Sequence, residues 1–467
     1  MLSAILRAAG ITTPQARVRP AAPRWIAGAA SLLLTAILAS WPAPASFAGE
    51  KSVYEEDIEY ALEQIEKECG HFFELKEIDW KAVSRQFRKE AERVRSDSEH
   101  LVLLKRLLAR VRDGHAAIVP LEKGKDVEWP DAPTGKWVGP GFALCKIGKK
   151  IYVKHSWSSA ERAGLEVGSQ VLAIDDKPVT KWLDAKIEEV SDTRSFSTDH
   201  HAFFFVTHGG LAAVQGSRIK LEVKEPGGKR SKRTITYSGN ASARAQGPVA
   251  APEGLGHAGD ISFGKTQRGF GYIHIRRCRS ELPTLIDQAL SEIGSVPGMI
   301  LDFRGNSGGS FDHDAVLGRF VPEGKSLQFA KTIPSAGSNP YGGPVVVIVD
   351  ATTVSAGETG SGMFKEDGRA YMIGESPTAG MSSQKKTIEL PSRLFGLYVS
   401  IASNKGRFNQ GRGIEGIGVE PHEIISYSAK DLAKGVDTLI EAAERWLTRP
   451  KSSDVPYNPG QFGWKKP

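Results

Sequence analysis

A strand–turn–helix over residues 345–364 constrains this 467-residue chain more than any other segment. Val345 to Val349 form an apolar, β-branched run typical of a buried strand, and Asp350 to Thr353 interrupt it. Ser355 then stands where a helix is expected to begin. A serine on such a turn exposes its hydroxyl, and the backbone N–H groups that follow point toward whatever that hydroxyl attacks. The segment from Ser355 to Glu358 also fits an ordinary S-x-x-E capping box, which needs no catalysis.

The first 48 residues have the composition of a secretory signal. They contain four arginines and no acidic residue, residues 26–40 are apolar, and small residues surround Ala48. The apolar run is shorter than the roughly 20 residues that a membrane span needs. We therefore expect a signal peptide at 1–48, cleaved after Ala48, and an exported protein, periplasmic or extracellular, with no membrane span after cleavage. An uncleaved anchor is the alternative.

The charge of the remaining chain is nearly balanced. The whole sequence has 61 Lys and Arg against 54 Asp and Glu, so removing the four leader arginines leaves 57 against 54, a net charge of +3. This balance gives no electrostatic footprint for a nucleic acid, and we expect no nucleic-acid partner.

Changes in composition divide the rest of the chain into segments. Residues 49–116 carry apolar residues at helical spacing and predict an N-terminal helical domain. Residues 136–240 predict short strands and helices, and 241–266, rich in Ala, Gly and Pro, predict a linker. In 267–449, strands alternate with helices and a closing helix is expected at 431–447, whereas 450–467 reads as a disordered tail. The predicted fold is multidomain α/β.

The segment 136–240 resembles a PDZ domain. Gly139-Pro140-Gly141-Phe142 is similar to the carboxylate-binding loop of that family, and the pattern A-x-x-A-G-L-x-x-G follows at residues 160–168. Successive glycines let backbone N–H groups converge on a terminal carboxylate, and an exposed strand edge takes up the peptide. The resemblance implies peptide binding at Gly139, Gly141 and Phe142. The alternative for the two glycines is an ordinary turn at the start of a strand.

Five motifs in order resemble the serine peptidase family that contains carboxy-terminal processing proteases and the core of tricorn protease. They are DGHAAI at 113–118, LDFRGNSGGS at 301–310, VDATTVSAGE at 349–358, GESPTAG at 374–380 and GIEGIGVEP at 413–421. The resemblance implies a crotonase-like layered α/β catalytic core and a serine endopeptidase with Ser355 as its nucleophile. It also implies protein or peptide substrates, no cofactor and no metal.

The general base separates the branches of this family. Carboxy-terminal processing proteases use a lysine where this sequence has Gly380 or Met381, and neither side chain accepts a proton. The sequence therefore resembles the tricorn-like branch, which implies that His115 is the base, with an acid limb in the pH profile near the histidine range of ~6–7. Lys385 or Lys386, on opposite faces of an expected strand, is the alternative base.

A histidine base needs an orienting partner. The resemblance assigns Glu415, which in tricorn works through a serine just before the histidine. Here that neighbour is Gly114, so Glu415 has to reach His115 directly or through water. Asp113 is a rival, although an aspartate in such a turn usually binds the local backbone.

For the oxyanion hole, the N–H of Ala356 is one expected donor and Gly308 or Gly309 supplies the other. The function expected is an exported serine endopeptidase that hydrolyses unfolded or C-terminal protein segments, with PDZ-assisted substrate capture. A non-catalytic peptide- or ligand-binding protein on the same fold is the alternative. A class A β-lactamase-like enzyme is disfavoured because glutamate replaces the lysine of S-x-x-K. The sequence does not set the oligomeric state.

Overall fold

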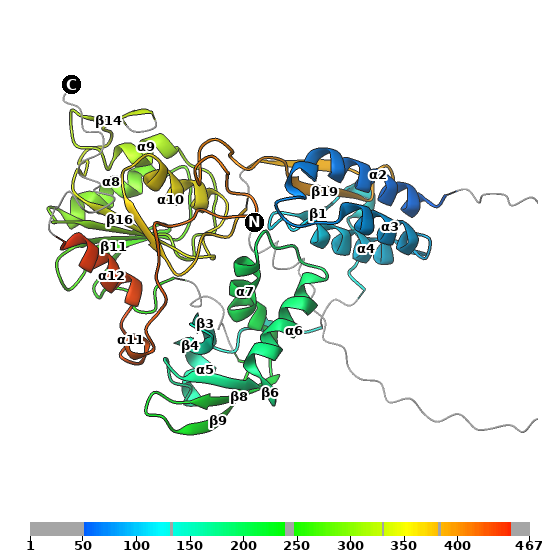
Figure 1. Ribbon diagram of the computed structural model, residues 1–467, viewed down its shortest axis with the longest axis horizontal. Helices are drawn as coiled ribbons and strands as arrows, with labels where there is room; N and C mark the ends of the chain where they lie inside the picture. Colours follow the sequence, from blue (N-terminus) through cyan, green and yellow to red (C-terminus); the bar gives the residue numbers. More distant parts are fainter. Residues whose placement is uncertain (1–50, 131–133, 239–246, 329–330, 382–383, 450–467) are drawn as a thin grey trace, which may run out of the picture.

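A seven-stranded sheet is the largest layer of the protein. The structure is a computed structural model that describes residues 51–130, 134–238, 247–328, 331–381 and 384–449 (Figure 1). The sheet order is β10-β11-β12-β13-β16-β17-β20, antiparallel from β10 to β12 and parallel from β12 to β20. The strands are β10 (Gly256–Ala258), β11 (Ile261–Lys265), β12 (Gly271–Ile275), β13 (Met299–Asp302), β16 (Val345–Val349), β17 (Tyr371–Gly374) and β20 (Glu423–Ile424).

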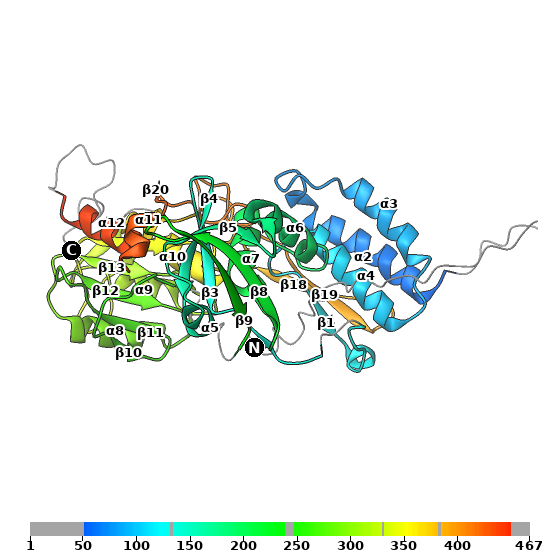
Figure 2. The same cartoon turned by 90° about the horizontal axis from the view of Figure 1, so that it is seen from below.

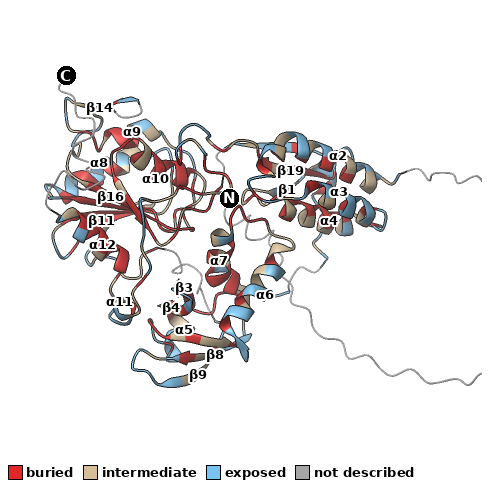
Figure 3. Cartoon of the chain, viewed as in Figure 1, coloured by how far each residue is buried: buried red, intermediate tan, exposed pale blue. Residues whose placement is uncertain are grey.

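Both faces of this sheet are covered, which is why its central strands read as continuous apolar runs. Every residue of β13 and β16 is buried (Figure 3). Val345, Val347 and Val349 pack with residues of the helices on one face, while Val346 and Ile348 pack with α12 on the other. The helices of the first face are α8 (Leu282–Ile293), α9 (His313–Gly318) and α10 (Ala356–Glu366); α11 (Ala429–Ala433) and α12 (Thr438–Leu447) belong to the second.

A second unit, residues 137–238, has a sheet in the order β3-β4-β5-β8-β9, with β6 beside β5. In β3, an edge strand, Phe142 and Leu144 face the unit's own core, whereas Cys145 packs with the second face of the seven-stranded sheet. The elements are β3 (Phe142–Ile147), β4 (Lys150–Ser156), α5 (Ser158–Arg162), β5 (Gln170–Ile174), β6 (Lys177–Pro178), α6 (Val179–Ser191), α7 (Asp199–Thr207), β8 (Arg218–Lys224) and β9 (Arg230–Thr236).

The N-terminal helices lie at the opposite end of the molecule from the seven-stranded sheet, and the second unit projects from the middle, at the bottom of Figure 1 and seen from below in Figure 2. They are α2 (Val53–Cys69), α3 (Trp80–Ala91) and α4 (Asp97–Arg110). They share an apolar cluster with a three-stranded sheet, β1-β19-β18, made of β1 (Ala117–Pro120), β18 (Lys385–Glu389) and β19 (Phe395–Ser400). The N-terminal helices are thus packed on strands from the end of the chain.

Smaller elements complete the described residues. They are η1 (Gly70–Phe72), η2 (Glu122–Gly124), β2 (Trp137–Val138), η3 (Gly209–Leu211), β7 (Ala213–Val214), β14 (Ser326–Gln328) and β15 (Thr332–Pro334). No helix of the described ranges is both long enough and apolar enough to cross a membrane. The predicted signal peptide at 1–48 and the predicted tail at 450–467 lie outside the described residues.

Two expectations from the sequence need correction. The predicted linker at 241–266 contains β10 and β11, because Ile261 and Phe263 are buried in the core despite the Ala- and Gly-rich surroundings. The closing helix expected at 431–447 is two helices, α11 and α12. They separate at Gly435, whose φ of +68° a helix does not accommodate, and Asp437 caps the second one through the N–H groups of Leu439 and Ile440.

Candidate active site

Ser355 occupies a sharp turn between β16 and α10. Its backbone is at φ +56° and ψ −123°, a conformation that an L-amino acid adopts only when the surroundings impose it. The turn is fixed from several sides: the Thr353 hydroxyl donates to the Phe303 carbonyl at 2.9 Å, and Val354 N–H donates to the Asn306 carbonyl at 3.0 Å. Ser355 is only partly buried. A strained serine at a strand-to-helix turn is the arrangement that exposes a nucleophilic hydroxyl.

Glu358, one helical turn after Ser355, joins this turn to residues 378–381. Its fully buried carboxylate accepts hydrogen bonds from Ser355 N–H (3.0 Å), the Thr378 hydroxyl (2.6 Å), Gly380 N–H (2.8 Å) and Met381 N–H (2.9 Å). Burial raises the pKa of Glu358 to about 8, and the hydrogen bonds from Thr378, Gly380 and Met381 oppose that rise. Gly380 and Met381 therefore use their main-chain N–H groups to hold Glu358.

Gly308 packs against the nucleophile turn, and Gly309 packs against the Cys278 main chain beside it. A Cβ on Gly308 would lie 2.8 Å from the Ser355 Cβ, and one on Gly309 would lie 1.7 Å from the Cys278 carbonyl oxygen. The Gly308 N–H donates to Asn306 Oδ1 at 2.9 Å, so this donor is already engaged. Within the described ranges, the N–H groups of Gly309 and Ala356 donate to no acceptor. These two donors are the ones available to an oxyanion.

His115 lies at the edge of the N-terminal sheet, next to Asp113 and Ser400. Its N–H donates to Asp113 Oδ1 at 2.8 Å, and its ring Nδ1 is 3.5 Å from the Ser400 hydroxyl. No hydrogen bond joins His115 to Ser355 in the part of the chain that the structure describes. Burial lowers the pKa of His115 to about 4, so the imidazole is neutral at neutral pH and able to accept a proton.

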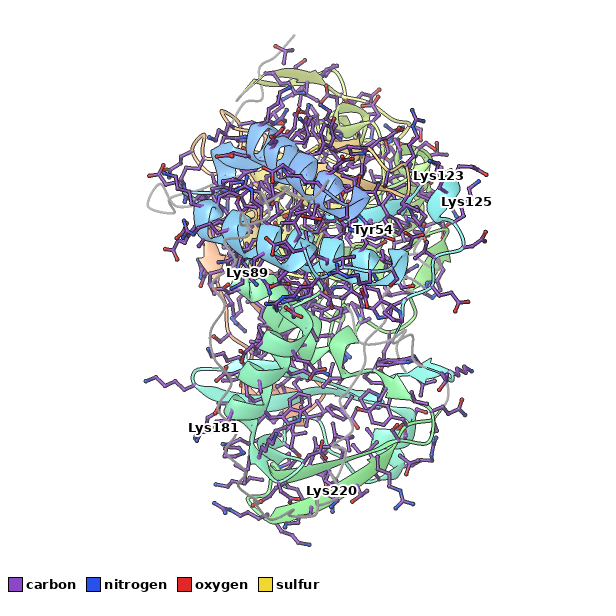
Figure 4. The ribbon with its side chains drawn as sticks, turned by 90° about the vertical axis from the view of Figure 1, so that its right-hand side faces the viewer. Tyr54, Lys89, Lys123, Lys125, Lys181 and Lys220 are labelled. Carbon is purple, nitrogen blue, oxygen red and sulfur yellow. The ribbon has the colours of Figure 1, made fainter. Side chains whose placement is uncertain are left out.

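Glu415 contacts Lys76 and Ser197. Its carboxylate accepts hydrogen bonds from Lys76 Nζ at 2.7 Å and from the Ser197 hydroxyl at 3.0 Å. The same Ser197 oxygen accepts the N–H of Gly114 at 2.8 Å. Glu415 is 0% and Lys76 4% exposed, in contrast to the exposed lysines labelled in Figure 4. The carboxylate therefore reaches the histidine segment through Ser197 and the Gly114 main chain.

Close packing also explains why residue 114 is a glycine. A Cβ there would lie 2.7 Å from Met381 Cγ and 3.0 Å from His201 Cε1. Ser197 and Ser400, which contact this segment, were not identified from the sequence. Each is a single serine outside any motif, and only the tertiary fold brings it near His115.

The two alternative lysines point to different surroundings, as their neighbouring positions on a strand predict. Lys386 forms a surface ion pair with Glu68 at 2.8 Å. Lys385 pairs across the strands with Ser400, and burial lowers the pKa of its ammonium group while Asp113 opposes the shift. The charge of Lys385 in turn helps to lower the pKa of His115.

The segment expected to bind a peptide carboxylate, Gly139 to Phe142, is buried at the start of β3. The Gly141 carbonyl accepts the Trp157 N–H at 2.7 Å, and a Cβ on Gly141 would lie 2.3 Å from the Trp157 carbonyl oxygen. Gly141 has a φ of +86°, so both its conformation and its contacts require glycine. Elsewhere in the described ranges, no group of three or more His, Cys, Asp or Glu side chains is placed to hold a metal ion.

Comparisons with known proteins agree with this geometry. Residues 269–425 match the family model described as Peptidase family S41. The carboxyl-terminal-processing protease of Picosynechococcus sp. is 22% identical over 361 residues, which cover 74% of this chain and 77% of that protein. The putative tricorn protease homolog 2 of Streptomyces coelicolor is 24% identical over 400 residues, which cover 82% of this chain and 31% of that protein.

A solved structure, mature CPAF complexed with lactacystin, has a TM-score of 0.57 at 14% identity, covering 85% of this chain and 98% of that chain. This likeness shows a shared mixed α/β, multidomain fold. The family match lies on the sheet and helix that present Ser355. Residues 269–425 therefore match a peptidase family S41 domain, and together with these relatives the match supports a serine peptidase.

Proposed function

We propose that the protein is an exported endopeptidase that cleaves unfolded or C-terminal segments of other proteins, with Ser355 as nucleophile and His115 as general base. The observation that carries this proposal is the strained backbone of Ser355 beside two N–H groups, on Ala356 and Gly309, that have no other acceptor. Residues with such strained backbone conformations cluster at active sites and other functional sites. The signal-like composition of residues 1–48 supports export.

The reaction follows from these groups. Ser355 Oγ attacks the carbonyl carbon of the scissile peptide, and its proton moves to Nε2 of His115. The negative charge that develops on the carbonyl oxygen is bound by the N–H groups of Ala356 and Gly309; one such donor contributes ~3 kcal/mol to the transition state. The imidazolium then gives its proton to the leaving amine, which breaks the peptide bond and leaves an acyl ester on Ser355. Water, deprotonated by His115, hydrolyses that ester.

The lowered pKa of His115 supports its assignment as the base. A neutral imidazole is ready to accept a proton, whereas a lysine has first to lose one. Gly380 and Met381 at the family's lysine position favour the tricorn-like branch. Glu415 belongs to the same proposal as a group that acts on the histidine segment through Ser197 and Gly114.

The substrate class rests on the second unit and on the names of the relatives. We infer that residues 136–240 are a PDZ-like domain, that the seven-stranded core is crotonase-like, and that a substrate's C-terminal strand adds to the edge strand β3 beside Gly139, Gly141 and Phe142. One relative is named a carboxyl-terminal-processing protease, which fits capture of a chain end.

A fluorophosphonate probe tests the nucleophile and the base together. Probe should label the wild-type protein on the peptide that contains Ser355, as located by mass spectrometry. Ser355→Ala should remove the label, and His115→Ala should slow labelling by about 100-fold or more, since a general base contributes roughly 10²–10⁴ in rate. Ser98→Ala, on α4, is a matched control that should label as the wild type does. Label on another residue in Ser355→Ala protein would overturn the assignment.

A further inference from the structure

Three strands bring His115, Ser400 and Lys385 into one row. β1 pairs antiparallel with β19, with Ala117 opposite Tyr398, and the turn just before β1 brings the ring Nδ1 of His115 to 3.5 Å from the Ser400 hydroxyl. On the other side of β19, Ser400 lies opposite Lys385. Residues directly opposite one another in a sheet point to the same face. Ser400 therefore stands between the histidine and the lysine.

The partner of the Ser400 hydroxyl is the carboxylate of Asp113. Asp113 Oδ1 accepts this hydroxyl at 2.9 Å and Oδ2 accepts the Ser400 N–H at 2.6 Å. Both residues are 1% exposed, so water does not replace these contacts. The carboxylate also accepts the N–H of His115. Asp113 is thus more than a local turn residue, because it fixes the position of Ser400 across 287 residues of sequence.

The directions of these hydrogen bonds determine the tautomer of His115. An ionised carboxylate only accepts hydrogen bonds, and a serine hydroxyl has one proton to give. That proton is directed to Asp113, so the Ser400 oxygen faces Nδ1 of His115 as an acceptor. Nδ1 then carries the ring proton and Nε2 is left with a free lone pair. The 3.5 Å separation is long, as is common before substrate binds, and it should shorten when the ring becomes positively charged.

We propose that Ser400 and Asp113 form the relay that orients His115, with Nδ1–H donating to Ser400 Oγ and Ser400 O–H donating to Asp113. Both are positioning residues, and no proton is transferred along the relay. It keeps Nε2 unprotonated for Ser355 and stabilises the imidazolium after proton transfer. This inference rests on the proposed role of His115. Glu415, bound to Lys76 and Ser197, positions the main chain at Gly114 instead.

The first test is kinetic. Ser400→Ala should lower the rate of fluorophosphonate acylation by about 10- to 100-fold, less than the ~10⁴-fold loss seen when a triad carboxylate is neutralised, because Asp113 remains. The acid limb of its pH–rate profile should also move to lower pH, because the imidazolium loses a hydrogen-bond acceptor and the pKa of His115 falls. Ser400→Thr keeps the hydroxyl and should recover most of the rate. The charged and titratable groups that face His115 are Asp113, Lys385 and His201, and all three are unchanged in these variants.

A matched control is Ser195→Ala. The Ser195 oxygen accepts the Asp113 N–H at 2.7 Å, so this variant also removes a hydroxyl beside Asp113, but one that does not touch the imidazole. Its acylation rate should stay within about threefold of the wild type, and its acid limb should not move. If Ser195→Ala and Ser400→Ala lower the acylation rate equally, the loss reflects a general disturbance of the structure around Asp113, and the relay is refuted.

The second test uses the wild-type protein, so it does not require that a Ser400 variant folds. In ¹⁵N-histidine-labelled wild-type protein, the ring shifts of His115, assigned by their absence in His115→Ala, report which nitrogen is protonated. We expect the Nδ1–H form at neutral pH, and an Nε2–H form would refute the relay. If Ser400→Ala acylates as fast as the wild type while His115→Ala is inactive, the relay is refuted and the proposed function stands. Full activity in His115→Ala would refute the proposed function itself.

Discussion

Removing one partner of the buried Lys76–Glu415 ion pair should destabilise the protein far more than removing both. Lys76 Nζ and Glu415 Oε1 are 2.7 Å apart, with side chains 1% and 0% exposed. Lys76→Met removes the ammonium group next to the buried Glu415 carboxylate. Breaking a buried pair in this way costs about 3–5 kcal/mol. With a urea slope of ~3 kcal/mol/M, a loss of ~3 kcal/mol lowers the unfolding midpoint by about 1 M.

The double variant separates this charge effect from lost packing. Glu415→Gln keeps an oxygen that accepts the Ser197 hydroxyl, and Lys76→Met keeps most of the apolar stem. Combining them removes both charges, so the double variant should be more stable than Lys76→Met alone by about 2 kcal/mol or more, a coupling expected only of residues in direct contact. Urea unfolding of the four proteins, followed by tryptophan fluorescence, measures this cycle.

Lys386→Met is the matched control, because Lys386 forms a pair with Glu68 at almost the same distance, 2.8 Å, with its side chain 47% exposed. Such a surface pair contributes ~0–1 kcal/mol, so its midpoint should barely move. If Lys76→Met shifts the midpoint no more than Lys386→Met does, or if the double variant is the least stable of the four, the reasoning about the buried pair is wrong.

Three further predictions concern catalysis. Because burial lowers the pKa of His115 to about 4, the acid limb of the pH–rate profile for acylation should lie near pH 4, below the ~6–7 expected from the sequence. The rate should fall below this pKa, where the base is protonated, and stay level above it. An acid limb above pH 8 would instead indicate a lysine base. Lys385→Ala should change the acylation rate by no more than about tenfold, against several orders of magnitude for His115→Ala; the reverse order would favour a Ser–Lys dyad. Amidating the C-terminus of a good peptide substrate should weaken its binding, and equal affinity of the acid and amide forms would argue against carboxylate capture at Gly139–Phe142.

The local signals in the sequence predicted the nucleophile turn and several elements around it. The run at 345–349 is β16, and a helix begins right after Ser355. These elements follow from short-range rules, an apolar β-branched run for a covered parallel strand and helical spacing for an amphipathic helix. The helical character of the N-terminal segment is confirmed in the same way by α2, α3 and α4.

Such rules did not identify Ser400 beside the His115 ring, whereas Asp113 was already a candidate from the sequence. Ser400 reaches the histidine only because β1 pairs with β19, two strands almost 280 residues apart in sequence. Nothing near Ser400 in the sequence distinguishes it from other serines at the end of a strand. The linker prediction failed for a related reason: composition describes the average of a segment, whereas Ile261 and Phe263 are two buried positions inside it. In both cases, strand pairing and register determine which residues are in contact or buried, and local composition does not.

Ser197 and Thr198 connect the second unit to both halves of the candidate active site. Ser197 binds the Gly114 N–H next to His115, and Thr198 donates to the Ala379 carbonyl at 2.9 Å, beside the main-chain groups that hold Glu358. One short segment therefore supports both the histidine side and the serine side. Moving the second unit away would remove hydrogen-bond partners from both sides at once, and each buried polar group left unpaired costs about 1–3 kcal/mol. The geometry of the site and the docking of this unit thus stabilise each other.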